Sequence, residues 1–159
     1  MTIIKICGSK YTGRRKIVSS LYNLLNIDVL DVEEVMRTEP ASKALNKIED
    51  YIIEHKKSNF VINCDGTENF LDSMLNNLEV ITIILTYEQE HIDELNIGDD
   101  TMTIEDLQED FNKYSELYSS DGYMFNINKM QDIDILFAII DIYNYHISNT
   151  IYDRNLDQE

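Results

Sequence analysis

Short apolar runs alternate with longer segments of helical periodicity along most of the chain. The runs are nearly continuous and rich in β-branched residues, and they cover 3–7, 29–32, 60–64, 80–85 and 123–127. Runs of this kind are typical of strands buried on both faces. Between them, apolar residues recur every three or four positions, which predicts helices with one apolar face. Strands that alternate with helices predict an α/β fold built on a parallel sheet.

The periodic segments place five helices between and after these strands. They cover 14–25, 41–52, 70–78, 104–118 and a last helix that begins near Asp132. On the last helix we expect five apolar residues to be buried: Ile133, Leu136, Phe137, Ile140 and Ile147. The segments 31–40, 96–101 and 126–131 are expected to be loops, and Thr103 is expected to cap the helix that follows it.

Helices on both faces of one sheet give a three-layer sandwich with five parallel strands. We expect one domain over 1–150 and a polar tail over 151–159. In such sheets ligands bind at the carboxyl ends of the strands. The loops that follow the strands are therefore where functional residues are expected.

Charge is distributed very unevenly over the 159 residues. The net charge is −17, yet residues 1–16 hold five basic side chains and no acidic one. An acidic body repels nucleic acid, so we expect no direct nucleic-acid binding. The basic N-terminal cluster predicts an anion-binding site, and the acidic remainder leaves open either a solvated surface or a surface for a basic protein partner.

The chain has no apolar run of the length a membrane helix needs and no signal-peptide layout at its start. We therefore expect no membrane association and a cytoplasmic location, or the host cytoplasm if the protein is viral. Cys7 and Cys64 end neighbouring predicted strands and are expected to be reduced and buried.

The segment between the first strand and the first helix carries the strongest chemical signal. A phosphate loop has the pattern G-x-x-x-x-G-K-[ST] in this position, and the glycine spacing here matches it. Arg14 replaces the lysine, and Arg15 replaces the hydroxyl residue that would hold Mg²⁺. The candidate phosphate-binding residues are Gly8, Ser9, Lys10, Tyr11, Thr12, Gly13, Arg14 and Arg15. The alternative is an ordinary glycine turn from strand to helix.

Together with this loop, two further segments make the chain resemble P-loop nucleoside-monophosphate kinases, most of all small viral deoxynucleotide and thymidylate kinases. The segment 36–40, Met-Arg-Thr-Glu-Pro, is similar to the Thr-Arg-Glu-Pro segment of thymidylate kinases with two residues exchanged. The segment 61–65 resembles the strand that ends in their Asp-Arg pair, with Asp65 as the acid and Gly66 in place of the arginine. The resemblance in element order covers about residues 2–148.

The resemblance implies an activity and a set of catalytic residues. It implies ATP and Mg²⁺ as cofactors and a (deoxy)nucleoside monophosphate as acceptor. Arg14 would neutralise donor charge, Arg37 would hold the acceptor phosphate, and Asp65 would organise Mg²⁺ through water. No metal-ligand cluster is expected in the chain itself.

The segment between residues 85 and 123 departs from the resemblance, because in those kinases it forms a lid over the donor phosphates. Those kinases close several arginines on the donor phosphates, whereas Lys113 is the only lysine or arginine between 85 and 123, among many acids. An arginine from the second subunit of a homodimer would compensate. Two hypotheses therefore stand: a nucleotide-binding P-loop protein, with or without phosphoryl transfer, and a catalytically degenerate kinase fold that serves as an acidic binding or regulatory module.

Overall fold

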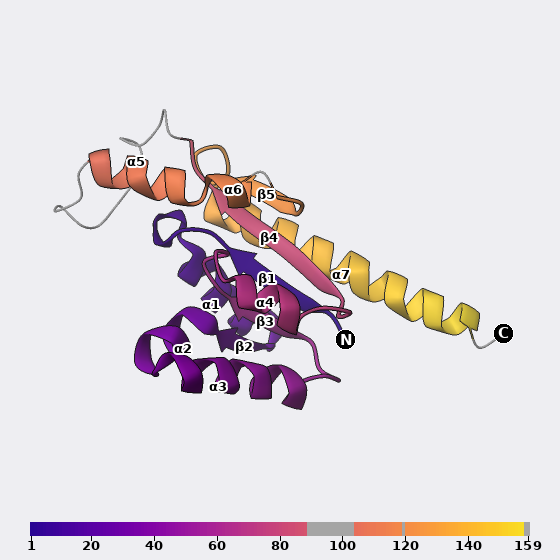
Figure 1. Ribbon diagram of the computed structural model, residues 1–159. Coiled ribbons are helices and arrows are strands. Elements are labelled where there is room, and N and C mark those ends of the chain that lie inside the picture. Colours follow the sequence, from indigo (N-terminus) through magenta and orange to yellow (C-terminus); the bar gives the residue numbers. More distant parts are fainter. Residues whose placement is uncertain (89–103, 119, 158–159) are drawn as a thin grey trace.

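The fold is a five-stranded, all-parallel sheet between two layers of helices (Figure 1). The computed structural model of the protein describes residues 1–88, 104–118 and 120–157. The strands are β1 (Ile3–Cys7), β2 (Asp28–Asp31), β3 (Phe60–Asn63), β4 (Val80–Thr86) and β5 (Tyr123–Asn126), in the order β2-β3-β1-β4-β5. The predicted α/β three-layer fold is confirmed.

Each face of the sheet packs against its own helices. On one face, α1 (Arg14–Leu25) and α7 (Asp132–Asp157) cover the side chains of Ile4 and Ile6. On the other face, α3 (Ala41–Glu54) and α4 (Asn69–Met74) cover Ile3 and Cys7. The alternation of these four β1 residues shows why a strand buried on both faces reads as a continuous apolar run.

Three further helices lie at the carboxyl edge of the sheet. They are α2 (Val32–Thr38), α5 (Ile104–Lys113) and α6 (Ser115–Tyr118). The expected loop over 31–40 is wrong, because α2 follows β2 directly. Asp31 caps this helix by accepting a hydrogen bond from the Glu34 amide at 3.0 Å. The single helix expected over 104–118 is divided into α5 and α6.

The buried face of α7 agrees in part with the expected one: Leu136 is buried, and Ile140 and Ile147 pack partly buried against the same core. Ile133 and Phe137 are each 55% exposed, while Ile135, Leu136, Ile139 and Tyr143 are buried against α1 and the sheet. This helix carries apolar residues on all sides, so the periodicity is compatible with more than one buried face. The helix also continues to Asp157, into the segment expected to be a polar tail.

Two sequence predictions fall outside the described residues, namely the loop over 96–101 and the helix cap at Thr103. Cys7 and Cys64 are buried thiols with their sulfur atoms 3.7 Å apart on neighbouring strands, as expected. Among the described helices, none combines the length and the apolar character needed to cross a membrane.

Candidate functional site

The glycine loop joins the central strand β1 to α1, as a phosphate loop requires. Gly13 has φ of 73°, a left-handed conformation that glycine adopts at little cost, and it starts α1 directly. The amides at the start of a helix have no intrahelical acceptor and carry the positive end of its dipole. The loop therefore presents the N-terminus of α1 at the carboxyl edge of the sheet.

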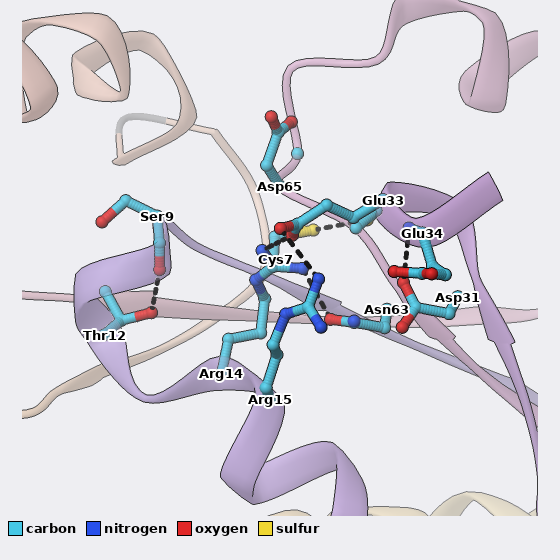
Figure 2. A network of polar contacts seen from close by, with 12 residues as sticks. Cys7, Ser9, Thr12, Arg14, Arg15, Asp31, Glu33, Glu34, Asn63 and Asp65 are labelled. Carbon is cyan, nitrogen blue, oxygen red and sulfur yellow. Dashed lines mark hydrogen bonds and ion pairs between the residues drawn. The ribbon is translucent and has the colours of Figure 1, made fainter. Parts of the chain in front are cut away.

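The loop itself is closed by its own hydrogen bonds (Figure 2). The Tyr11 amide donates to Ser9 Oγ at 3.3 Å, and the Thr12 amide donates to the Ser9 carbonyl at 3.1 Å. The Thr12 hydroxyl donates to the same carbonyl at 2.6 Å, which completes a short 3-10 turn, η1 (Lys10–Thr12). Phosphate loops bind through backbone amides, so two amides of this loop are already in use.

Arg14 is buried and paired inside the protein. Its side chain is 2% exposed, its Nη1 donates to Asn63 Oδ1 at 2.5 Å, and its Nη2 donates to Glu33 Oε2. Its Nε is buried and has no hydrogen-bond partner among the described residues. The cation at the lysine position of the motif therefore faces the end of β3 and α2, and it keeps one donor unsatisfied.

Glu33 binds both arginines of the loop. Its second oxygen, Oε1, accepts from Arg15 Nη2 at 3.2 Å (Figure 2). Burial acts to raise the pKa of Glu33, but the hydrogen bonds and charges of Arg14 and Arg15 outweigh it and hold this pKa below its usual value. Glu33 is therefore a carboxylate with one arginine on each oxygen.

Arg15 points away from the loop. Its side chain is 57% exposed and lines a hollow of about 400 Å³ with Tyr22, Val29 and Asp31, between α1 and β2. The guanidinium at the position of the magnesium-binding hydroxyl therefore lies beside that of Arg14, on the other oxygen of Glu33 (Figure 2). It meets Arg14 only through Glu33.

Arg37, the expected contact for an acceptor phosphate, lies on the exposed side of α2. Its Nη2 donates to both oxygens of Glu34, at 2.7 and 2.8 Å, and the side chain is 66% exposed. Neighbouring helical residues of opposite charge form such pairs readily and add little stability. Arg37 is accessible to a ligand, with Glu34 as its partner inside the protein.

Asp65 follows β3, and its hydrogen bonds stay mostly within its own turn. Its Oδ1 accepts from the Thr67 amide at 2.8 Å and from the Thr67 hydroxyl at 2.7 Å. Partial burial acts to raise the pKa of Asp65, but the Thr67 and Glu68 hydrogen bonds, with Lys113, hold it below the usual value. Burial and the Asp65 charge instead raise the pKa of Glu68. Asp65 is therefore the member of this pair that ionises first as the pH rises.

The described end of the acidic segment predicted in place of a lid, α5 and α6, lies near this turn. Burial, and then the nearby charge of Asp65, raise the pKa of Tyr114, the residue between α5 and α6. A Cβ on Gly66 would come within 2.7 Å of Leu117 Cδ2. An arginine at position 66, where the resemblance places it, would need the Leu117 side chain to move, and the φ of 96° there disfavours any side chain.

Between the loop and α5 lies an open cavity of about 610 Å³. Its charged lining combines two lysines with three carboxylates: Lys10, Lys113, Asp106, Glu109 and Asp110. Tyr87 fixes α5 by donating its hydroxyl to Asp110 Oδ2 at 2.7 Å and to the Leu107 carbonyl at 3.1 Å. The acids therefore face the side of the loop where a kinase would place donor phosphates.

The fit to the implied cofactors differs between phosphate and Mg²⁺. The unsatisfied Nε of Arg14 and the start of α1 are donors that suit a phosphate oxygen. For Mg²⁺, Arg15 cannot be a ligand, and no group of three or more acidic, histidine or cysteine side chains within 1–88, 104–118 and 120–157 is arranged for a metal. The described residues therefore fit a phosphate group, while the motif position that would supply a hydroxyl ligand to Mg²⁺ is an arginine.

Solved structures identify the fold. A gluconokinase from Sinorhizobium meliloti 1021 has a TM-score of 0.68 at 10% identity, over 96% of this chain and 97% of that chain. The YorR protein from Bacillus subtilis, in complex with phosphorylated GDP, has 0.64 at 12% identity, over 92% and 98%. A shikimate kinase from Bacteroides thetaiotaomicron has 0.58 at 11% identity, over 92% and 98%.

This chain has a P-loop kinase fold. No protein-family model and no curated protein matches it. Identities of 10–12% show the fold alone, so the resemblance to viral deoxynucleotide and thymidylate kinases stays a prediction.

Two residues of the site were not assigned a role from the sequence. Glu33 lies in a segment expected to be a loop, and its bond to Arg14 joins positions 19 residues apart. Asn63 ends a strand that was recognised, yet its contact with Arg14 spans 49 residues. Only the spacing Asp31 to Glu34, an acid followed three positions later by glutamate, could have indicated the start of α2.

Proposed function

We propose that this protein binds the phosphate group of a nucleotide at residues 8–15, and that phosphoryl transfer is weak or absent. One observation carries the proposal: Arg14, at the start of α1, is a buried cation with one unsatisfied donor. Buried polar groups are nearly always hydrogen-bonded, so the Nε of Arg14 favours an acceptor such as a phosphate oxygen.

Weak transfer follows from the same residues. Phosphoryl transfer depends on positive charge placed around the reacting phosphate. Glu33 already neutralises Arg14, and the cavity beside the loop holds more carboxylates than lysines. Such a site can hold a phosphate group yet gives little stabilisation to a transition state.

Calorimetry with ATP, dTMP and dGMP, each with and without Mg²⁺, tests the proposal. We expect at least one nucleotide to bind, with an affinity that Mg²⁺ does not raise, because Arg15 replaces the metal-binding hydroxyl residue. Inorganic phosphate should raise the melting temperature by mass action, and Arg14→Ala should lose most of this gain.

Tyr123→Ala, which changes an exposed tyrosine of β5, is the control and should keep the whole gain. If no nucleotide binds, or if phosphate stabilises Arg14→Ala as much as the wild type, the proposal is wrong.

A second candidate function is an acidic module that binds a basic protein. It is favoured by the way α5 is held: Leu107 is buried and Tyr87 bonds the helix, while Glu105, Asp106 and Glu109 are exposed. The helix is thus fixed to the protein while three of its acids remain accessible to solvent. Charge-steered association falls steeply with salt.

For a protein partner we expect an association rate that drops between low and physiological ionic strength. The variant Glu105→Gln, Asp106→Asn, Glu109→Gln should slow this association about tenfold or more. It leaves Asp110, which holds Tyr87, in place. Surface plasmon resonance measures both effects, and an unchanged rate in a variant that still unfolds cooperatively would remove this surface from the interface.

A further inference from the structure

All three arginines that the sequence assigns to phosphate binding are paired with one short helix. Glu33 of α2 binds Arg14 and Arg15, and Glu34 of α2 binds Arg37. The helix therefore supplies the counter-charge for all three of these arginines. These pairs join α2 to the start of α1 as well as to its own last turn.

The contact made by Glu33 has the geometry of a bound anion. One carboxylate offers one oxygen to each of two guanidinium groups. A phosphate group binds arginines in the same way, through separate oxygens and charge-assisted hydrogen bonds. Glu33 and an incoming phosphate therefore compete for the same donors, above all for Nη2 of the buried Arg14.

Helix α2 is held at one end more firmly than along its length. Asp31 caps its first turn and Val32 is fully buried. Glu33 lies next to that anchor, with its side chain 32% exposed. Glu34 and Met36 are exposed. A change of the Glu33 rotamer, which leaves Val32 and Val35 packed, would thus free Arg14 without unpacking the sheet.

We propose that Glu33 is a tethered internal ligand, which occupies the anion position of the phosphate loop and must leave Arg14 and Arg15 before a phosphate group binds there. The inference rests on the proposed function, since it concerns the same site. It makes binding conditional on α2: the apparent affinity equals the intrinsic affinity reduced by the fraction of molecules in which Glu33 has moved away.

Glu34 provides a matched control for Glu33. It is the next residue on the same helix and also an arginine-bound glutamate, but its partner is the exposed Arg37. Removing its charge changes the net charge of the protein by the same amount. Any effect of general electrostatics on phosphate binding therefore appears in Glu34→Gln as well.

The first experiment is calorimetry of inorganic phosphate and of ATP, without Mg²⁺ and at low ionic strength. We expect Glu33→Gln to bind at least about tenfold more tightly than the wild type and Glu34→Gln to stay within about twofold of it. Equal or weaker binding by Glu33→Gln, or equal gains in both variants, would overturn the inference. If the wild type binds and Glu33→Gln binds no better, the proposed function still stands.

A second experiment uses the wild type alone, in case Glu33→Gln does not fold. Hydrogen exchange is measured with and without phosphate, or with ATP. We expect amides of 32–38 to exchange faster in the complex and amides of 13–17 to exchange more slowly. Unchanged or slower exchange of 32–38 in a complex that protects 13–17 would overturn the inference. Absence of binding by both the wild type and Glu33→Gln would overturn the proposed function together with it.

Discussion

Glu33→Ala is expected to lower the free energy of unfolding by about 3 kcal/mol. The change leaves the Arg14 guanidinium buried, with Asn63 as its one remaining partner in the described network. Removing one partner of a buried ion pair typically costs 3–5 kcal/mol, and the partial exposure of Glu33 favours the lower end of that range. Urea unfolding of both proteins measures the difference.

Two control variants test whether the loss of stability comes from the buried charge of Arg14. Arg15→Ala removes the exposed arginine that shares Glu33 and should cost at most about 1 kcal/mol. The double variant Arg14→Leu, Glu33→Leu should recover most of the stability, because apolar residues can replace a buried ion pair at little cost. A cost for Glu33→Ala no larger than that for Arg15→Ala would contradict the buried pair.

Acid should remove the stabilisation that the Glu33 carboxylate gives to the folded protein. The pKa of Glu33 is lower in the folded protein than its usual value of 4.5. A group of this kind stabilises the fold fully above its unfolded pKa, and the stabilisation is lost as the pH falls through the lower folded value. The difference in stability between the wild type and Glu33→Ala should therefore shrink below about pH 4.5.

The central strands and the first helix could be predicted from local pattern because burial there is periodic and strong. The run at 3–7 and the helix at 14–25 were predicted with the observed bounds. Helix α2 was missed because it has seven residues and a single fully buried one, Val32, so periodicity carries little signal. Its start was indicated only by the capping relation between Asp31 and Glu34.

The site residues, too, could be predicted only where the signal is local in the sequence. The glycine loop and its cations are contiguous, so the sequence reveals them directly. Where those cations point is decided by residues far away in the chain: Glu33 and Asn63 draw Arg14 toward the β3 edge, while Arg15 lies against the α1–β2 hollow. A motif fixes the position of a charge in the chain but not the partner that neutralises it in space.

The turnover of the wild type with ATP, Mg²⁺ and dTMP or dGMP is expected to be at least tenfold below the roughly 1–100 s⁻¹ typical of kinases. Each factor of ten corresponds to about 1.4 kcal/mol of barrier. Arg14 is neutralised by Glu33, and Arg15 replaces the metal-binding hydroxyl residue. ADP formation in a coupled assay measures the rate, and turnover within the kinase range would exclude a degenerate site.

Restoring the motif separates the two causes of low turnover. The double variant Arg14→Lys, Arg15→Thr supplies the usual lysine and hydroxyl, but Glu33 remains within reach of a cation at position 14. We therefore expect little gain from this variant alone and a further gain of about tenfold or more when Glu33→Gln is added. Adding Glu34→Gln instead changes the charge equally and should have no such effect. If the double variant reaches full activity with Glu33 in place, the carboxylate does not block the loop, and the two substitutions in the motif account for the whole loss.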